Sequence, residues 1–263
     1  MIRRLTTIGF IFIGIVLVAG GPARADEIAK MTRMVSSMGH DAPSFATLRR
    51  ACDADALCVA KFLRDRIGDG AELVPQDSSV KKSLSWQKAE PALTSVLADE
   101  GRTLVLVLSR FDATSVLKVI AELAVAPNRI VLDVRAMEEG VDMDGMRRMV
   151  SLFMGHKKRA FQIRYATGKN VDWRIPTPSK LLGMDHIEVL VGPETNAAGE
   201  VFAMLLQKYV RAEIKGEPTR ARGFILESIP VMHGWVLNVP RARVHIPELD
   251  IENGVSPTVV VPE

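Results

Sequence analysis

The central and C-terminal parts of the chain alternate between continuous apolar runs and segments whose apolar residues recur at helical spacing. Thr103–Leu108 is a continuous apolar run that predicts a buried strand, and Asp112 then stands where it can cap a helix reaching about Ala124. A second buried strand is predicted at 130–134. Strand, helix and strand at this spacing predict a parallel, right-handed βαβ unit.

The same alternation continues toward the C-terminus. It predicts a helix around 144–154, a strand near 161–164, a buried strand at His186–Val191, a helix over about Ala197–Val210 and strand-like structure in roughly the last fifty residues. Together these elements predict an α/β core in which helices pack on a sheet. Sites in such cores tend to lie beyond the carboxyl ends of strands, which here are the segments 135–140 and 192–198.

The chain before this core has a different pattern. Apolar residues at helical spacing there are Leu57, Ala60, Leu63 and Ile67. Residues 26–70 therefore predict helical structure, which the Gly-Asp-Gly at 68–70 ends. Residues 71–98 are mixed and polar and predict a connector. We expect a helical N-terminal region and connector over 26–98, and a core domain over 99–263.

The first 25 residues predict a signal peptide. Arg3 and Arg4 precede an apolar run at 8–19, and Ala-Arg-Ala at 23–25 predicts a cut before Asp26. As a helix, this run of 12 residues reaches ~18 Å, well short of a ~30 Å hydrocarbon core. An uncleaved anchor is the alternative. We expect a periplasmic or secreted protein with no membrane span after cleavage.

Composition and charge narrow the classes of partner. The 263 residues are 48% hydrophobic and 25% charged, a balance typical of a folded domain. The formal net charge of +3 comes from three arginines in the leader, and 31 basic and 31 acidic residues remain without it. This neutrality argues against a general nucleic-acid partner.

The two cysteines, Cys52 and Cys58, predict a disulfide in an oxidising compartment. A continuous helix would hold their Cα atoms ~9 Å apart, beyond the ~7 Å that a disulfide tolerates. A bridge therefore requires a break between them, and Asp53 or Asp55 can cap a helix that starts there. Two buried free thiols are the alternative. The five histidines are scattered, so we expect no metal site and no cofactor.

Four short motifs occur in order along the predicted core. They are Leu-Asp-Val-Arg at 132–135, Thr-Asn-Ala-Ala-Gly-Glu at 195–200, Gly-Glu-Pro-Thr-Arg-Ala-Arg-Gly at 216–223 and Gly-Val-Ser-Pro-Thr-Val-Val-Val at 254–261. In order, spacing and strand–turn–helix context they resemble the C-terminal-processing (tail-specific) serine peptidases. The resemblance implies a Clp protease/crotonase-like fold over roughly 101–263.

The resemblance also assigns positions to the peptidase machinery. It places the serine nucleophile at Ala197 and the general-base lysine at Arg222, and Leu226 stands where some members have an orienting glutamine. An alanine methyl group cannot attack a carbonyl carbon. A guanidinium, with a pKa of about 12.5–13.8, stays protonated at neutral pH and cannot accept a proton. The resemblance therefore implies a degenerate member that lacks the Ser-Lys dyad.

The oxyanion-binding turn also departs from the family pattern. Glu138 and Glu139 replace a proline and a glycine, and their negative charge works against an oxyanion. Gly140 and the Ala198 amide are what remains of the pocket.

We therefore expect an inactive, peptidase-like protein that acts as a binding or assembly module. Its ligand would be a peptide or protein held at a remnant cleft formed by Gly140, Thr195, Ala197 and Ala198. Thr195 and Asn196 are expected to cap the following helix.

Two enzymatic alternatives stay open. The first is an active serine-type endopeptidase or other hydrolase with relocated chemistry. Its candidate residues are Thr195, Ser228 and His233, with Asp133 or Glu200 as acids or bases. The second is a crotonase-type acyl-CoA enzyme on the same fold, against which the predicted compartment argues. Asp133 and Arg135 point to the same side of a strand, so a structural ion pair is expected there.

Overall fold

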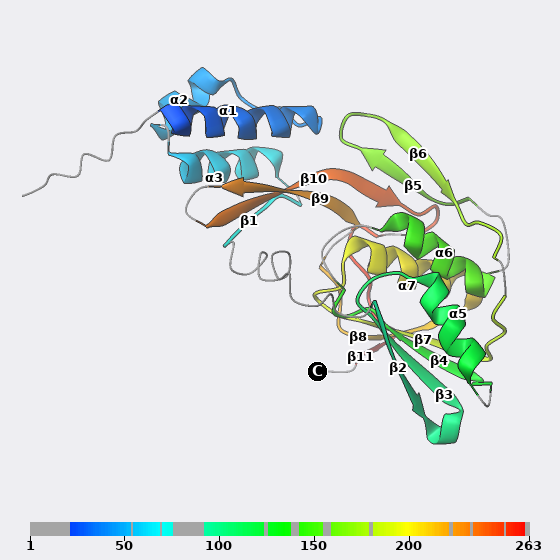
Figure 1. Cartoon of the computed structure of the whole chain (residues 1–263). Helices are drawn as coiled ribbons and strands as arrows, with labels where there is room; N and C mark the ends of the chain where they lie inside the picture. The colour runs from blue at the N-terminus through cyan, green and yellow to red at the C-terminus, as the bar shows by residue number, and fades with distance from the viewer. Residues whose placement is uncertain are drawn as a thin grey trace, which may run out of the picture.

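The computed structural model describes residues 22–53, 55–68, 70–75, 92–123, 126–137, 142–154, 159–178, 181–220, 223–231, 234–249 and 251–260. Figure 1 shows the chain, with helices α1, α2 and α3 at one end and a fan of strands at the other. Most of the predicted signal peptide lies outside the described residues, as do Gly140, Arg222 and His233. The predictions made for those positions stay predictions.

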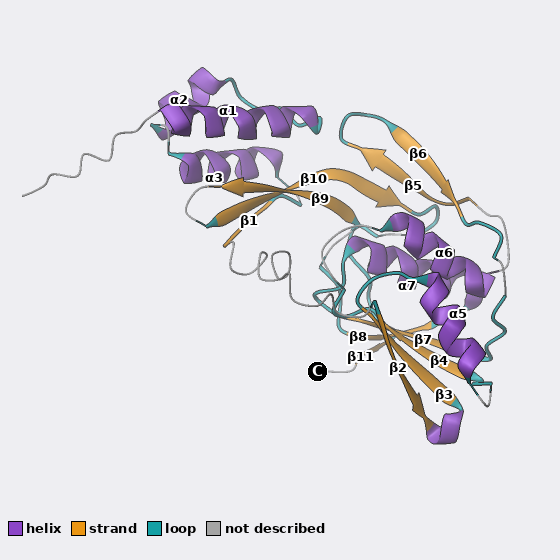
Figure 2. Cartoon of the chain, viewed as in Figure 1, coloured by secondary structure: helices purple, strands orange, loops and turns teal. Residues whose placement is uncertain are grey.

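The helices are α1 (Pro22–Ser37), α2 (Phe45–Cys52), α3 (Ala56–Ile67), α5 (Ala113–Glu122), α6 (Met143–Met154) and α7 (Ala197–Val210), with a 3₁₀ turn at Asp99–Gly101. The strands are β1 (Glu72–Pro75), β2 (Leu93–Ala98), β3 (Thr103–Leu108), β4 (Arg129–Asp133), β5 (Arg159–Tyr165), β6 (Asn170–Arg174), β7 (His186–Val191), β8 (Glu213–Gly216), β9 (Phe224–Val231), β10 (Trp235–His245) and β11 (Val259–Val260). Figure 2 shows how the two kinds of element are arranged.

A six-stranded sheet carries the core, in the order β11-β8-β7-β4-β3-β2. All neighbours pair in parallel except β2, which runs antiparallel to β3. The unit β3–α5–β4 has the predicted parallel form, and β3 and β7 have the predicted bounds. Helices α5, α6 and α7 lie on one side of this sheet (Figure 1).

Helix α5 begins at the predicted cap. The Asp112 carboxylate accepts hydrogen bonds from the backbone N–H groups of Thr114 (3.0 Å) and Ser115 (3.2 Å), and from the Ser115 hydroxyl. The bond from the Ser115 hydroxyl is the main reason that the pKa of Asp112 lies below its ordinary value of 3.8, although partial burial acts in the opposite direction. The charged form of Asp112 therefore stabilises the start of this helix.

Strand β10 connects the two hydrophobic cores of the molecule. Its first half contributes Leu237 and Val239 to a core formed with helices α1, α2 and α3. Its second half contributes Ala242 and Val244 to the larger core around α6 and α7. In the second sheet β10 lies between β1 and β5 and also pairs with β9, and β6 follows β5 at the edge. The N-terminal helices thus pack on strands from the C-terminal part of the chain.

Residues 71–98 contribute an edge strand to each sheet. Strand β1 pairs antiparallel with β10, and β2 pairs antiparallel with β3. The sequence predicted only a connector here because β2 leaves most of its side chains exposed, so its residues lack the alternation of a half-buried strand. The boundary predicted between 98 and 99 stays a prediction.

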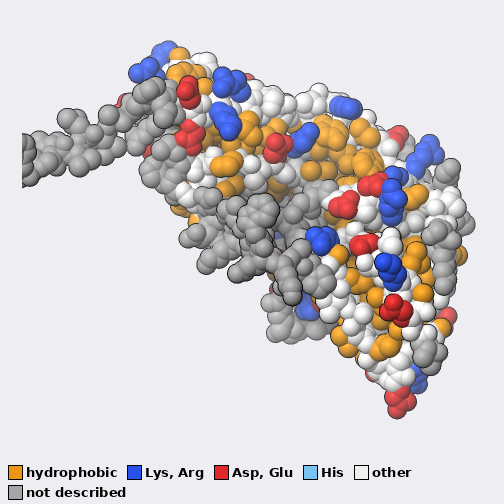
Figure 3. All heavy atoms as spheres, viewed as in Figure 1, with side chains coloured by type: hydrophobic (Ala, Val, Ile, Leu, Met, Phe, Trp, Pro, Cys, Tyr) orange, Lys and Arg blue, Asp and Glu red, His pale blue; other side chains and the backbone are white. Residues whose placement is uncertain are grey.

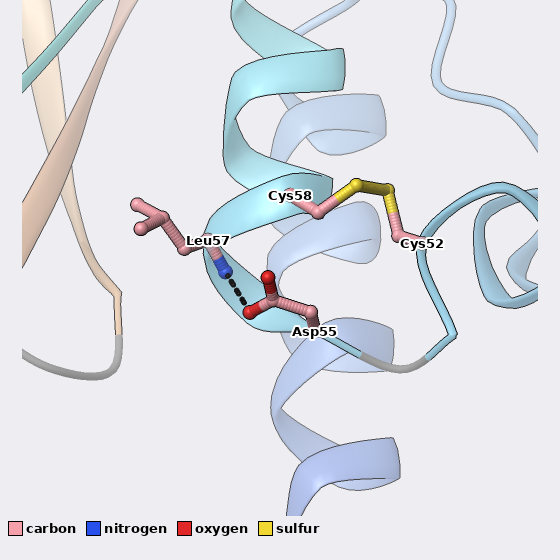
Figure 4. Close-up of a disulfide and its surroundings, with 4 residues drawn as sticks. All are labelled: Cys52, Asp55, Leu57 and Cys58. Carbon is pink, nitrogen blue, oxygen red and sulfur yellow. Dashed lines mark hydrogen bonds between the residues drawn. A yellow bond between two sulfur atoms is a disulfide. The ribbon is translucent and has the colours of Figure 1, made fainter.

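The disulfide between Cys52 and Cys58 is confirmed, and so is the predicted break between two helices. Helix α2 ends at Cys52, Asp53 adopts the left-handed conformation (φ 44°), and Asp55 caps α3 by accepting from the Leu57 N–H at 3.1 Å. This turn brings the two cysteine Cα atoms to 5.5 Å (Figure 4). The separate helices therefore satisfy a distance that one continuous helix would violate.

Two absences hold for the described part of the chain. No helix in it combines the length and the apolar character that a bilayer crossing requires. No three of its His, Cys, Asp and Glu side chains gather in an arrangement that could hold a metal ion.

Candidate functional site

The turn from β7 into α7 is the centre of the candidate site. The Thr195 hydroxyl accepts a hydrogen bond from the Gly192 N–H (2.9 Å) and donates one to the Val134 carbonyl (3.1 Å). Asn196 caps α7 by accepting from the Gly199 N–H at 2.9 Å, as expected for this residue type. Thr195 thereby joins the start of α7 to the end of β4.

Three of the four residues predicted to form a remnant cleft lie together at this helix start. Thr195 is 1% exposed, Ala197 2% and Ala198 1%, whereas Gly140 lies outside the described residues. Packing is close here: a methyl group added to Gly199 would lie 2.7 Å from a methyl carbon of Thr195 and 3.1 Å from the Met137 sulfur. A ligand would reach Ala197 only after the atoms that cover it move.

A buried carboxylate in the first turn of α7 holds the segment after β8. Glu200 is fully buried, and one of its oxygens accepts a hydrogen bond from the Thr219 hydroxyl. Its second oxygen accepts from the Gly223 N–H at 2.7 Å. These contacts join two of the motifs found in the sequence, 195–200 and 216–223, across the site. Both Glu200 and Thr219 belong to motifs recognised in the sequence, but no contact between them was predicted.

The fourth motif, at 254–261, contacts the segment after β8 through Thr219. The Thr219 hydroxyl accepts from the Val255 N–H at 2.8 Å, and the Thr219 N–H donates to the Val255 carbonyl at 3.1 Å. Gly254 lies against Thr219 so closely that an added methyl group would come within 2.6 Å of its carbonyl oxygen. Gly216 likewise leaves only 2.1 Å between such a methyl group and the Val191 carbonyl oxygen. All four motifs therefore meet at the carboxyl ends of β4, β7 and β8.

The acidic residue at the end of β4 is held by its neighbour, which confirms the expected ion pair. Asp133 accepts from the Arg135 backbone N–H (3.0 Å), from its Nε (3.0 Å) and from its Nη2 (2.8 Å). The Arg135 side chain also lies along Gly192, where an added methyl group would be 3.5 Å from its Cγ. Asp133 therefore fixes an arginine beside the turn.

The hydroxyl and carboxyl groups named as relocated catalytic candidates already have structural partners. The Thr195 hydroxyl donates to a main-chain carbonyl, and Glu200 is bound by Thr219 and Gly223. The Ser228 hydroxyl lies 2.8 Å from the Asn238 side-chain oxygen within the β9–β10 hairpin. The orienting-glutamine position, Leu226, is partly exposed on β9. No described contact brings one of these hydroxyls to an imidazole or an amine.

A cavity of about 270 Å³ lies at the opposite, amino-terminal end of β7 and is lined by 184–188, Val210, Arg211 and Glu213. Nearby, Glu188 pairs with Arg129 and with Lys215, and Lys215 also pairs with Glu213. Burial alone would lower the pKa of Lys215, but its hydrogen bonds to Glu213 and Glu188 outweigh that effect and raise the pKa above 10.5. This charged cluster is separate from the site at the carboxyl ends.

Solved structures similar to this chain support the fold. A lipoprotein from Streptococcus agalactiae aligns with a TM-score of 0.59 at 12% identity, covering 97% of this chain and 95% of its own. A candidate peptidase from Parabacteroides merdae aligns with a TM-score of 0.59 at 11% identity, covering 90% of this chain and 89% of its own. A candidate S41 protease from Bacteroides fragilis aligns with a TM-score of 0.52 at 18% identity, over 65% of this chain and 50% of its own. The mixed α/β, Clp protease/crotonase-like core is therefore confirmed.

The sequence was also compared with family models and with curated proteins. No curated protein matches it. The model described as "Peptidase family S41" matches residues 102–261. This match covers more than half of the chain and includes all four motifs that meet at the strand ends, so the protein belongs to peptidase family S41.

Proposed function

We propose that this chain is a non-catalytic member of peptidase family S41 that binds a peptide or another protein. The observation that carries the proposal is Ala197. It is the first residue of α7, directly after the turn from β7, where the family motif has its serine. A methyl group at this position cannot form an acyl-enzyme bond.

The neighbouring groups support the same conclusion. The hydroxyl two positions before Ala197, on Thr195, donates its proton to the Val134 carbonyl rather than to a base. The counterpart of the general base in the sequence motif is Arg222, which lies outside the described residues. An arginine stays protonated at neutral pH and cannot accept a proton from a nucleophile.

Binding is proposed because the scaffold of the site persists without its chemistry. The Asn196 cap, the buried Glu200 and the Thr219–Val255 contact hold the segments at the carboxyl ends of the strands in place. Arg135, Glu194 and Arg220, which neighbour the buried residues in the sequence, are partly or fully exposed, and we propose them as a charged rim that the ligand contacts. We place the chain in the periplasm or outside the cell, since its disulfide requires an oxidising compartment.

Catalysis is tested first, on the purified protein with its disulfide intact. A fluorophosphonate probe and a fluorogenic peptide library should give no labelling and no cleavage above a buffer blank. The double variant Ala197→Ser, Arg222→Lys is the matched comparison, because any activity that it gains confirms the alignment of the catalytic positions. Covalent labelling of a wild-type residue, or peptide cleavage by the wild type, would refute the non-catalytic assignment.

Binding is tested by selecting peptides from a displayed library and measuring the affinity of the best sequences by calorimetry. Arg220→Glu at the rim should weaken the selected peptides at least about tenfold, roughly 1.4 kcal/mol. Arg211→Glu is the matched control, because Arg211 is exposed at the far end of α7. Equal loss in both variants, or no peptide that binds at about 100 µM or tighter, would contradict a peptide site at the strand ends.

A further inference from the structure

Strand β2 is an open edge of the six-stranded sheet. It pairs with β3 on one side and has no partner on the other among the described strands. Val96 is 54% exposed on one face of the sheet, which it shares with the exposed Val107 of β3, and Leu97 is 47% exposed on the other face. On the lower part of the molecule, where Figure 1 places β2, β3 and α5, Figure 3 shows hydrophobic side chains at the surface between polar and charged ones.

The backbone of β2 offers hydrogen-bonding groups at this edge. The Ser109 N–H donates to the Ala92 carbonyl at 3.2 Å, so Ala92 and Ser109 form a hydrogen-bonded pair in the antiparallel ladder. Such pairs alternate along two antiparallel strands. Residues 94 and 96 therefore also point their backbone groups toward β3. The N–H and C=O groups of Leu93, Ser95 and Leu97 point to the open edge.

The side chains of this edge match those of a second, antiparallel copy. The sequence Leu93-Thr-Ser-Val-Leu97 reads alike in both directions by residue class: leucine at both ends, β-branched residues inside them and serine at the centre. It contains no charged residue and no proline, which are the residues that usually prevent edge strands from pairing. Ser95 and Leu97 point to the face of the sheet on which α5 packs, and both are exposed. Helix α5 therefore leaves the edge at β2 uncovered on that face.

We infer that β2 pairs with β2 of a second copy of this chain, about a twofold axis at Ser95. In that register Ser95 faces Ser95 of the other copy, and Leu93 faces Leu97 at both ends. Three hydrogen-bonded residue pairs form, each with two main-chain bonds. On the other face of the sheet, Thr94 lies opposite Val96. The two sheets then join into one continuous sheet through an interface that is the same on both copies.

The charges at the two ends of β2 favour this antiparallel partner. Asp99 and Glu100 follow the strand and are exposed, with the exposed Arg102 donating to the Asp99 carbonyl, whereas Arg110, whose N–H donates to the Ala92 carbonyl at 3.5 Å, is exposed at the other end. Antiparallel pairing brings the acidic end of one copy to the arginine end of the other. One strand pair is a small interface, so we expect a reversible dimer with a dissociation constant of about 10 µM.

Cysteine crosslinking tests the register. In a hydrogen-bonded pair the facing Cα atoms are ~5.5 Å apart, within the range of a disulfide. Ser95→Cys should therefore form a covalent dimer under mild oxidation. Val96→Cys is the matched control, since the two Val96 residues would be offset by two positions and lie ~8 Å apart, too far for a disulfide. Equal crosslinking of both variants would overturn the proposed register.

Analytical ultracentrifugation of the protein at about 100 µM, with charge variants, tests the dimer itself. With a dissociation constant of about 10 µM, about four fifths of the chains are paired at this concentration, so the wild type should sediment with a weight-average mass of about 1.8 times that of the monomer. Ser95→Asp and Ser95→Lys each place like charges face to face at the axis, and each should weaken association about tenfold or more. Mixing the two variants should restore the dimer. A monomeric wild type, or a Ser95→Asp variant that dimerises like the wild type, would overturn the inference. A short peptide that binds this edge while the chain stays monomeric would also overturn it.

Discussion

The contact between Glu200 and Thr219 should contribute to stability, and the structure allows us to estimate how much the free energy of unfolding changes when it is removed. In Glu200→Gln the side chain keeps its shape but loses its charge, and one acceptor oxygen becomes an NH₂ donor. The one oxygen that remains can accept from the Thr219 hydroxyl or from the Gly223 N–H, but not from both. If the NH₂ group faces Gly223, two donors meet. If it faces Thr219, the threonine proton loses its acceptor.

Either arrangement leaves one donor unsatisfied at a residue with no solvent exposure. A hydrogen bond to a charged group contributes about 1.5–3 kcal/mol, and an unsatisfied buried donor costs about 1–3 kcal/mol. We therefore expect Glu200→Gln to lower the free energy of unfolding by about 2–4 kcal/mol. Thr219→Val removes the same bond from the other side and also leaves the Val255 N–H without its acceptor, so it should cost about 2–3 kcal/mol.

Urea unfolding followed by circular dichroism measures these changes, and a double-mutant cycle isolates the contact. Because both single variants remove one shared bond, the double variant should be about 1–2 kcal/mol more stable than additivity predicts. Glu194→Gln is the matched control, because Glu194 is exposed in the same turn, and it should stay within about 0.5 kcal/mol of the wild type. A Glu200→Gln variant as stable as the control, or strict additivity, would refute this account of the site.

Three further predictions concern the scaffold. Replacing both cysteines of the Cys52–Cys58 bridge by alanine should cost about 2 kcal/mol in urea unfolding, as expected for a short loop, and a variant as stable as the wild type would contradict this. Asp112→Ala should cost about 1 kcal/mol at pH 7. Because the folded-state pKa of Asp112 is lowered, its stabilisation is present above pH 3.8 and is lost as the pH falls further, so the difference from the wild type should shrink in acid. Gly216→Ala, at φ +115° with a carbonyl oxygen 2.1 Å from the added methyl group, should lower stability by more than about 3 kcal/mol, whereas Gly183→Ala, with no neighbouring atom, should change it little in thermal unfolding.

The parts of the fold predicted from sequence are those in which burial leaves a local pattern. Strands β3, β4 and β7 are nearly continuous apolar runs because helices and neighbouring strands surround them, so each was predicted to within one residue at either end. The cap at Asp112 and the break after Cys52 were predicted for the same reason, since turns and helix starts select particular residue types. Strand β2 has an exposed pattern, so no local signal distinguished it from a loop.

The four motifs that meet at the strand ends could be recognised in the sequence, but the contacts between them could not. Asn196 could be placed because a helix start selects its residue type locally. Thr195 was expected to cap the same helix, but its hydroxyl instead joins Gly192 to the Val134 carbonyl, 61 positions away. The contacts from Glu200 to Thr219 and from Thr219 to Val255 join residues 19 and 36 positions apart. No periodicity links such residues, and only the fold brings them together. Their sole trace in the sequence is that each belongs to one of the four ordered motifs.

Under the proposed function, the residues that hold this site together are separate from those that would carry out the family's reaction. The groups that hold the strand ends together are Thr195, Glu200 and Thr219, and none of them is the nucleophile or the base of the family motif. Ala197 is buried in an apolar cluster, where a methyl group needs no partner. A serine hydroxyl there would require a hydrogen-bond acceptor or cost about 1–3 kcal/mol, and an arginine at position 222 offers only donors. Under the proposed function, alanine at 197 and arginine at 222 are therefore consistent with each other, because a chain without an accepting base is more stable without the serine.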